Sequence, residues 1–376
     1  MNPRERVLTT LQHKEPDRVP ISLGCAPSSM TPLAYERLKK YLGIKGEDDE
    51  IVGEQVVIKF DERILQKFEV DFRCIYLNSP RDWKGKTYQD GTFTDEWGIR
   101  YKRAGDYLEM VDHPLKDATV EDLQTYNWPD PHDSGRTDGV RKRAKELYET
   151  TDYAIDSYFI ASIFEQSWYL RGFERFLTDL VINQEFAEAL LDKVLEIQKG
   201  FFEEYLKAVG DYIHIVRVFD DLGMQTNLLM NPSLYRKLIK PRHKELYRFI
   251  KQRTKAKLLH HSCGAIYPLI GDLIEIGLDI LNPMQPKALN MDNPEKLKEK
   301  FGEKICFHGG IDIQEILPYG TPKQVREEVK KRIRGFAPGG GYILATAHNI
   351  QADVPPENVV AMFEAARKYG EYPLRI

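Results

Sequence analysis

The chain contains 376 residues, carries a formal net charge of −4, and is 30% charged and 42% hydrophobic. This composition is typical of a globular protein, and the lack of a basic stretch argues against a nucleic-acid partner. The sequence has no apolar run long enough to cross a bilayer, which argues against a membrane protein. Its four cysteines are too widely spaced for a disulfide framework, so we expect a reducing, cytoplasmic location.

The first elements in chain order are a short helix and a turn. Asn2 can cap the helix, Pro3 suits its first position, and Glu5 completes a capping box. Residues 15–21 form a turn that leads into a short strand. Residues 70–112 alternate aromatic and β-branched residues with polar ones, which predicts an antiparallel β insertion near residues 70–112.

From about residue 153 short apolar runs alternate with long amphipathic ones. The expected strand–helix pairs are 212–219 with 232–253, 257–260 with 265–276, 278–281 with 294–301, 305–307 with 322–335, and 342–345 with 356–369. This alternation predicts parallel βαβ units. Five such units, with room upstream for three more, favour an α/β fold built as a single (β/α)8 (TIM) barrel. We expect that barrel to be one domain over residues 1–376.

Polar residues gather where the predicted strands end, and in such a barrel the chemistry lies at the carboxyl ends of the strands. The residues at these positions are Asp220, Asp221, His261, Cys263, Asn282, His308, Asp312 and His348. A barrel without chemistry has no need of this concentration of imidazole, thiol and carboxyl groups. The predicted strand ends therefore mark a candidate active face.

A zinc site is the chemistry that these residues indicate. Two imidazoles and a thiolate from His261, Cys263 and His348 would supply three protein ligands and leave a fourth position open, as catalytic zinc requires. Asp220, Asp221 and Asp312 are candidates for a fourth ligand, a partner that orients a histidine, or a general acid.

Each of these assignments has a structural alternative. Polar residues at strand ends can simply hydrogen-bond to loop backbone, and His308 before two glycines can pack to hold a turn. Helix capping is the alternative for Asp220 and Asp221, and we expect one of the two to do only that. We retain Asp220, Asp221, Asp312 and His308 as candidate catalytic residues.

Two further features bear on cofactor and substrate. Residues 130–135 match the D-x-H-x-x-G pattern by which some proteins bind cobalamin, but they follow a proline-broken loop, so we interpret the match as accidental. The aromatic side chains of Tyr158, Phe159 and Trp168 are candidates for lining a pocket, with core packing as the alternative.

With these residues the sequence resembles the uroporphyrinogen decarboxylase superfamily over essentially its whole length. The matching segments are 4–6, 16–20, 171–174, 177–180, 261–264, 309–312 and 340–345. The resemblance implies a (β/α)8 barrel independently of periodicity. It leaves two chemistries open, because the superfamily contains metal-free decarboxylases and zinc methyltransferases that work with corrinoid proteins.

Departures from the family patterns favour the methyltransferase branch. The decarboxylases carry arginines after the first strand to hold substrate carboxylates, and residues 22–30 contain none. Methyltransferases that act on thiols use a later cysteine where this chain has His348. Fewer thiolates leave more positive charge on zinc, which favours activation of an ether oxygen.

The resemblance therefore implies zinc-dependent transfer of a methyl group from a small methylated donor to a corrinoid (cobalamin). The donor we expect is a methoxylated aromatic, which would undergo O-demethylation, and the corrinoid would be supplied by a carrier protein. Two alternatives remain open: a decarboxylase-like lyase of porphyrin biosynthesis, and a non-catalytic barrel that binds a corrinoid or its carrier. The sequence is compatible with a homodimer.

Overall fold

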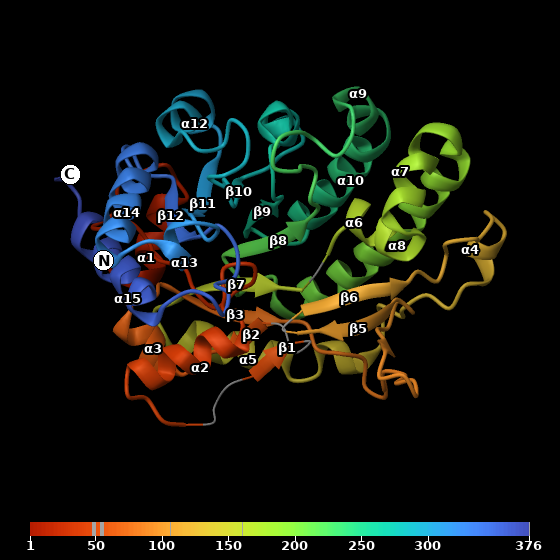
Figure 1. Ribbon diagram of the computed structural model, residues 1–376, viewed down its shortest axis with the longest axis horizontal. Helices are drawn as coiled ribbons and strands as arrows, with labels where there is room; N and C mark the ends of the chain where they lie inside the picture. The colour runs from red at the N-terminus through yellow and green to blue at the C-terminus, as the bar shows by residue number, and fades with distance from the viewer. Residues whose placement is uncertain (47–49, 53–55, 106, 160, 376) are drawn as a thin grey trace.

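A curled parallel sheet forms the centre of the computed structural model, which describes residues 1–46, 50–52, 56–105, 107–159 and 161–375. Its seven strands follow the order β12-β11-β10-β9-β8-β7-β3 (Figure 1). They are β3 (Phe72–Tyr76), β7 (Ala154–Tyr158), β8 (Ile215–Phe219), β9 (Lys257–His261), β10 (Ile280–Asn282), β11 (Cys306–Ile311) and β12 (Tyr342–Thr346). Because all run in parallel, their carboxyl ends meet at one face.

A short extended segment between the two edge strands occupies the eighth position of the barrel. The N–H of Ser22 donates to the carbonyl of Leu344 in β12, at 2.9 Å. On the other side, the N–H of Asp71 donates to the carbonyl of Ile21, also at 2.9 Å. Both edges of the curled sheet are thus hydrogen-bonded to this segment. The predicted TIM-barrel fold class is confirmed.

The strands after residue 153 alternate with helices, as predicted. These helices are α8 (Gln184–Val209), α10 (Lys240–Lys251), α11 (Ile270–Glu275), α12 (Pro294–Phe301), α14 (Pro322–Phe336) and α15 (Pro356–Tyr369). In α14, Val325, Val329 and Ile333 are buried at helical spacing, which places one apolar stripe against the sheet. The predicted helix over 232–253 is interrupted by a π-helical turn at Tyr235–Ile239, next to Pro241, which has no N–H to donate to the preceding turn.

The remaining helices lie before α8 or within loops. They are α1 (Pro3–Thr10), α2 (Pro32–Tyr41), α3 (Glu62–Lys67), α4 (Asp122–Thr125), α5 (Val140–Thr150), α6 (Phe164–Arg171), α7 (Phe173–Ile182), α9 (Pro232–Leu234) and α13 (Ile316–Tyr319). Helix α1 has the predicted capping box, because the Asn2 side chain accepts from the Glu5 N–H and Glu5 accepts from the Asn2 N–H.

An antiparallel sheet lies outside the barrel, where the sequence predicted an insertion. It consists of β4 (Phe93–Thr94), β5 (Arg100–Ala104) and β6 (Tyr107–Asp112) (Figure 1). The insertion is shorter than expected, because β3 belongs to the barrel and pairs in parallel with β7. A second small sheet pairs β1 (Glu50–Val52) with β2 (Val56–Lys59).

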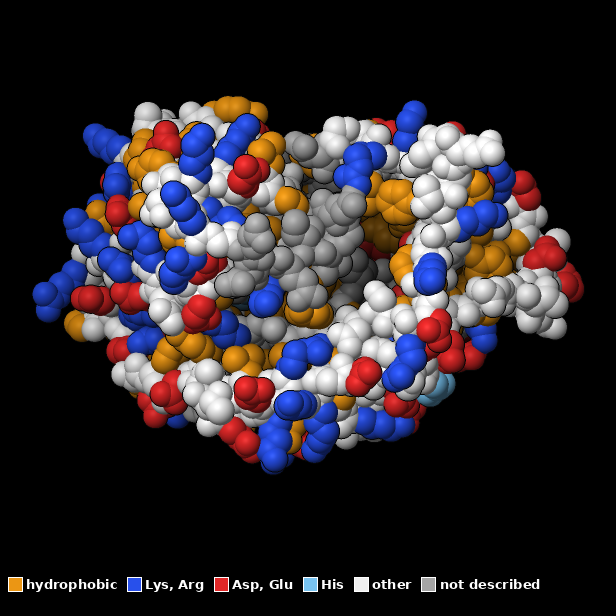
Figure 2. Space-filling model, turned by 90° about the horizontal axis from the view of Figure 1, so that it is seen from below, with side chains coloured by type: hydrophobic (Ala, Val, Ile, Leu, Met, Phe, Trp, Pro, Cys, Tyr) orange, Lys and Arg blue, Asp and Glu red, His pale blue; other side chains and the backbone are white. Residues whose placement is uncertain are grey.

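The two ends of the chain lie on the same side of the molecule (Figure 1). The N–H of Tyr372 donates to the carbonyl of Asp17, at 3.0 Å, which fixes the last residues against the first turn. One face of the molecule is hollowed near its middle, and hydrophobic side chains line one wall of the hollow (Figure 2). Within the described ranges, none of the helices has both the length and the apolar character needed to cross a membrane.

Candidate functional site

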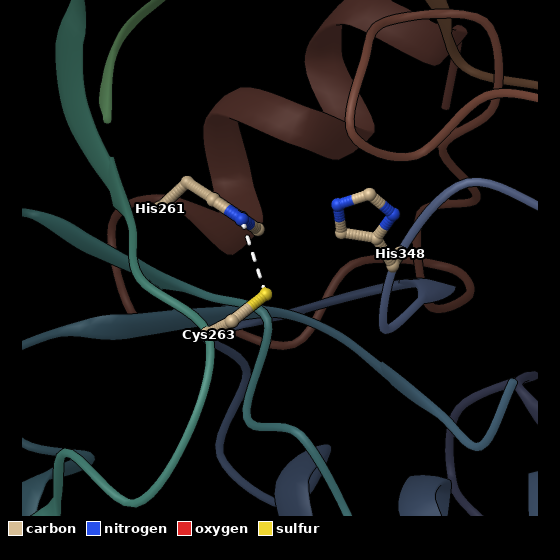
Figure 3. Close-up of side chains that lie close together, drawn as sticks. All are labelled: His261, Cys263 and His348. Carbon is tan, nitrogen blue, oxygen red and sulfur yellow. Dashed lines mark hydrogen bonds between the residues drawn. The ribbon is translucent and has the colours of Figure 1, made fainter. Parts of the chain in front are cut away.

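Three sequence-predicted ligands meet at the carboxyl end of the barrel. His261 is the last residue of β9, Cys263 follows in the next loop, and His348 lies two residues after β12. One ligand atom of each lies within 4.8 Å of the others. The Cys263 Sγ is 3.4 Å from His261 Nε2, and the His348 ring stands across from both (Figure 3). We call these residues the trio.

Asn282, at the end of β10, fixes the proton position on His261. Its amide nitrogen donates to the backbone carbonyl of His308, at 3.0 Å, so its other amide atom is the oxygen. That oxygen accepts a hydrogen bond from His261 Nδ1, which must therefore carry the proton. In the neutral ring the Nε2 lone pair is then directed toward Cys263, as metal coordination requires.

Burial determines the protonation of the trio. It lowers the pKa of His261 to about 4 and that of His348 to about 4, so both imidazoles are neutral near pH 7. Burial also raises the pKa of the Cys263 thiol well above its usual range, and the nearby charge of Asp221 adds to this effect. Of these three groups, only the Cys263 thiol therefore carries a proton that it must lose before it can bind a metal.

Asp221 is the predicted aspartate that faces the trio. Its Oδ1 accepts the Cys263 N–H at 2.6 Å and lies 3.6 Å from His261 Nε2. Gly264 allows this close approach of two loops, because a Cβ there would meet the Gly223 backbone at 2.3 Å. Its φ of +88° also favours glycine. Burial raises the pKa of the Asp221 carboxyl.

Asp220 has the capping role that the sequence assigned to one of the pair. Its carboxylate accepts the N–H groups of Ile163, Phe164 and Glu165 at 2.7–3.1 Å, and it also contacts His243 Nε2 at 2.7 Å. These contacts satisfy the start of α6. The structure therefore gives this carboxylate the capping position that was the alternative to a catalytic role.

Asp312 and His308 also hold other groups in place. Asp312 Oδ1 accepts the N–H of Gln314 at 2.7 Å and of Glu315 at 3.3 Å, as a loop cap. His308 Nδ1 accepts from the Asn282 amide at 2.9 Å, and burial lowers its pKa well below the usual value. His308 thus lies behind Asn282, whose amide connects its ring to His261.

The structure adds a buried carboxyl group that the sequence analysis missed. Glu165, in the first turn of α6, accepts a hydrogen bond from the Tyr169 hydroxyl at 3.0 Å. Burial raises its pKa well above the usual value, and the charges of Asp221 and Asp220 raise it further. The signal that was available is its place shortly after β7, since residues after barrel strands line the active face.

An aromatic cavity of about 340 Å³ lies over the carboxyl ends of β3 and β7. Its lining residues are Tyr76, Leu77, Asn78, Ser79, Asp95, Glu96, Trp97, Tyr101, Arg136, Tyr158, Phe159, Gln166, Tyr169 and Phe201. Tyr158 and Phe159 thus line a pocket, as one sequence interpretation proposed. Trp168 instead packs against Tyr169 and Phe173, with ring centroids 4.2 and 5.2 Å away.

A chain of aromatic contacts joins this cavity to the trio. The Tyr158 ring lies 5.9 Å from that of Phe219, and the Phe219 ring lies 5.7 Å from His261. A second cavity, of about 220 Å³, is lined by Cys263 and His348 themselves. Two residues of the trio thus line a cavity, and the aromatic cavity is connected to the trio through the Phe219 ring.

The D-x-H-x-x-G segment lies apart from this site. The exposed His132 ring contacts Glu204 at 3.1 Å on the outer surface, and the Asp130 side chain accepts the His132 N–H in a local turn. His132 is therefore a surface histidine. This position agrees with the interpretation of the motif match as accidental.

Comparison with known proteins identifies the family. The sequence profile of the uroporphyrinogen decarboxylase (URO-D) family matches residues 100–369. The chain therefore belongs to the uroporphyrinogen decarboxylase family, as the sequence motifs predicted, and this membership together with the barrel supports an enzyme.

Individual relatives are distant. A uroporphyrinogen decarboxylase of Alkalilimnicola ehrlichii is 22% identical over 373 residues, covering 97% of this chain and 93% of the relative. That of Aeromonas salmonicida is 23% identical over 285 residues, with 70% and 75% coverage. Among solved structures, a methyltransferase from Methanosarcina mazei superposes with a TM-score of 0.66 at 17% identity, covering 98% of this chain and 99% of the other. At this identity the superposition establishes the shared fold.

Proposed function

We propose that the protein is a zinc-dependent methyltransferase that moves a methyl group from a methoxylated aromatic to a corrinoid on a separate carrier protein. The observation that carries the proposal is the trio, with the His261 Nε2 lone pair directed at the Cys263 sulfur. A decarboxylase acting without metal has no use for two neutral imidazoles and a thiol converging at the mouth of the barrel.

The separation between two ligand atoms of the trio fits zinc. Zinc binds nitrogen at about 2.0–2.1 Å and thiolate sulfur at about 2.3 Å in a tetrahedral arrangement, so its ligand atoms lie about 3.3–3.8 Å apart. The separation of 3.4 Å between Cys263 Sγ and His261 Nε2 falls in this range. The Nδ1–H bond from His261 to Asn282 is the orienting contact expected of a zinc-bound histidine.

The trio and Asp221 would each have a role in breaking the O–CH3 bond of the donor. Zinc held by the trio would act as a Lewis acid on the ether oxygen of the donor. As the O–CH3 bond breaks, its electron pair stays on the aryl oxygen, and the Asp221 carboxyl, beside the trio, would supply the proton that makes this oxygen a phenol.

The aromatic cavity supports an aromatic donor. Rings of Tyr76, Trp97, Tyr158, Phe159 and Tyr169 are among its walls. Such walls favour a flat apolar ligand, because aromatic pairs gain energy beyond simple burial. The contacts from Tyr158 through Phe219 to His261 connect the wall of this cavity to the trio and support a donor bound on this side of it.

The alternative of porphyrinogen decarboxylation is supported by the names of the relatives but not by the charges of the site. The lining of the aromatic cavity includes Arg136, whose guanidinium forms a two-pronged ion pair with Glu96. Deeper in the barrel, Arg217 is paired with Asp156. A substrate with many carboxylates needs unpaired cations, and these two arginines are already neutralised.

Metal analysis and methyl transfer test the proposal together. The protein is purified without oxygen, supplied with zinc, and mixed with reduced cobalamin and a panel of methoxybenzenes and methylamines. We expect one zinc ion per chain and an absorbance change for methylcobalamin with a methoxybenzene. His261→Ala should lose both, whereas His132→Ala, a change at an exposed histidine, should keep both.

Each alternative predicts a different result. A folded protein that binds no zinc and decarboxylates a porphyrinogen would support the lyase and contradict the proposal. Zinc binding without transfer from any donor, even with a corrinoid carrier protein, would support a non-catalytic barrel. Transfer that survives His261→Ala would contradict the role of the trio.

A further inference from the structure

A cavity of about 390 Å³ opens at the amino end of the barrel, the end opposite the trio, and we call it the amino-end cavity. Lys257 and Cys306 are the first residues of β9 and β11, and Asp279 directly precedes β10, so the cavity lies where these strands begin. This end of a TIM barrel ordinarily serves stability. The lining residues are Leu11, Gln12, His13, Lys14, Lys257, Asp279, Lys304 and Cys306.

The positive charge of this lining is not neutralised. Its charged residues are three lysines and one aspartate. Lys14 and Lys304 have neither an ion pair nor a side-chain hydrogen bond among the described residues. The Lys257 ammonium lies 3.8 Å from the Asp279 carboxylate, which already pairs with Lys251 at 2.7 Å. The amino-end cavity therefore has an excess of positive charge, in a chain whose net charge is −4.

A fourth lysine, Lys298, adds to the positive charge beside the cavity. A Cβ at Gly341 would lie 3.1 Å from His13 Nδ1 and 3.4 Å from Lys298 Nζ, so the two side chains contact the same loop. The Lys298 ammonium donates to the Gly340 carbonyl. Burial lowers the pKa of His13, and the charges of Lys298 and Lys257 lower it further. Lysines from separate elements thus act on one wall of the cavity.

The backbone that presents Lys14 is fixed by the loop before β12. A Cβ at Gly340 would meet the Lys14 carbonyl oxygen at 2.2 Å, and the Gly340 φ of +79° favours glycine. The carboxylate of Glu15, the neighbouring acid, accepts the Gly339 N–H at 2.9 Å. The position of Lys14 is thus set before a ligand arrives, which reduces the cost of ordering the site on binding.

The kind of cation and the size of the cavity define the ligand. Ammonium groups bind phosphate oxygens as point charges, whereas the fork of arginine is better matched to a carboxylate. The described lining contains lysines and no arginine. Several uncompensated cations attract a dianion more strongly than a monoanion, because the Coulomb energy scales with the product of the charges. A volume of about 390 Å³ also leaves room for a small organic group beside a phosphate.

We infer that the amino-end cavity binds a phosphoryl group through Lys14, Lys257 and Lys304, either as inorganic phosphate or as part of a small organic phosphate. This binding site is separate from the trio and does not depend on the proposed function. A phosphate that binds only the folded chain would also raise the melting temperature of the protein.

Calorimetric titration of the zinc-free protein with inorganic phosphate tests the inference. It is performed in about 0.15 M sodium chloride, which screens exposed charges more than about 8 Å apart. We expect one phosphate per chain. Lys304→Met should weaken phosphate binding about tenfold, and the double variant with Lys14→Met should abolish saturable binding.

These substitutions should not lower the melting temperature in phosphate-free buffer, because each removes a cation without a partner among the described residues. Lys14→Gln and Lys304→Gln serve if the methionine variants do not fold. The matched control is Lys102→Met, at an exposed position of β5 outside the cavity, and it should retain the phosphate affinity.

Glycerol phosphate distinguishes the two sources of the phosphoryl group. Tighter binding of glycerol phosphate than of inorganic phosphate would assign an organic phosphate, and equal or weaker binding would assign inorganic phosphate. No saturable binding, acetate that binds as tightly as phosphate, or a phosphate affinity that survives both lysine substitutions would overturn the inference.

The fate of this inference is independent of the proposed function. His261→Ala should bind phosphate as tightly as the unchanged protein, even though it should lose zinc and methyl transfer. Loss of phosphate binding in His261→Ala would place the anion at the trio and would overturn the assignment to the amino-end cavity.

Discussion

Two clusters of polar side chains lie at opposite ends of the barrel, and they differ in how their groups are satisfied. At the amino end, the ionic cluster consists of Arg6, Asp17, Arg18 and Asp71. The Asp71 carboxylate accepts from Arg6 at 2.5 Å, from Arg18 at 2.8 Å and from the Ile21 N–H at 2.7 Å. Arg6 also pairs with Asp17, at 2.7 Å. The charges of this cluster are neutralised within the protein.

At the carboxyl end, the trio instead directs its ligand atoms toward one another. His261 Nε2 faces the Cys263 sulfur, and His348 completes a group within 4.8 Å. The ionic cluster fixes the segment that joins β12 and β3, whereas the trio is arranged around a shared point. This contrast agrees with the division of TIM barrels into a stabilising amino face and a chemical carboxyl face.

The largest expected effect is on stability, at the ionic cluster. Asp71→Asn should lower the free energy of unfolding by about 3–5 kcal/mol, because it leaves two arginines without a buried counter-charge. Urea unfolding measures this change. Glu69→Gln is the matched control: that carboxylate is 48% exposed and lies 3.7 Å from Arg18, so its loss should cost less than about 1 kcal/mol. Equal losses of stability in the two variants would contradict the expected difference between a buried and an exposed ion-pair partner.

The next largest effect is on zinc affinity, through a substitution that leaves the three residues of the trio unchanged. Asn282→Ala removes the group that orients His261 and should weaken zinc binding by about 10–100-fold, measured by competition with a zinc chelator. The control is Asn358→Ala, which removes hydrogen bonds of 2.8 and 2.7 Å to Leu317 and Gly320. It should lower stability but not zinc affinity. Unchanged zinc affinity in Asn282→Ala would contradict the assigned orientation of His261.

The smallest expected effect is the dependence of zinc affinity on pH, which is set by the proton that the trio releases. Both histidines of the trio have pKa values lowered to about 4, whereas the Cys263 thiol has its pKa raised by burial. Between about pH 6 and pH 8, zinc should therefore release one proton, from sulfur, so its affinity should rise about tenfold per pH unit. Calorimetry in buffers of different ionisation enthalpy counts this proton. Release of two or three would mean that the imidazoles are charged before zinc binds.

Periodicity predicted the barrel because its units are local. Each βα unit after residue 153 is visible in the sequence as an apolar run followed by an amphipathic one. The sequence predicted a turn over residues 15–21 that leads into a short strand, but it could not show that this segment closes the barrel, because its few hydrogen bonds join parts of the chain far apart in sequence. The alternating pattern of residues 70–112 led us to assign β3 to the antiparallel insertion. That assignment was wrong because the residues of a strand do not show which strand it pairs with.

The site could be predicted only in part, for a related reason. His261, Cys263 and His348 were predicted from their places after β9 and β12. The sequence could not show which of Asp220 and Asp221 faces the trio. Successive residues of an extended chain point to opposite sides, and the bend after β8 determines which side each one takes.

Glu165 and Gln166 were missed because α6 is buried on most sides and therefore lacks an amphipathic pattern. The buried Glu165 carboxyl and the Gln166 amide nitrogen, which has no partner among the described residues, could be recognised only from the structure, which shows the groups around them.

The insertion that carries β4, β5 and β6 has a consequence for how such enzymes diverge. Asp95, Trp97 and Tyr101 belong to it and form part of the aromatic cavity, whereas the trio belongs to barrel loops more than 150 residues later. One wall of the cavity and the proposed zinc ligands are thus encoded in separate stretches of the gene. Exchange of residues 93–112 would change that wall and leave the residues of the trio as they are.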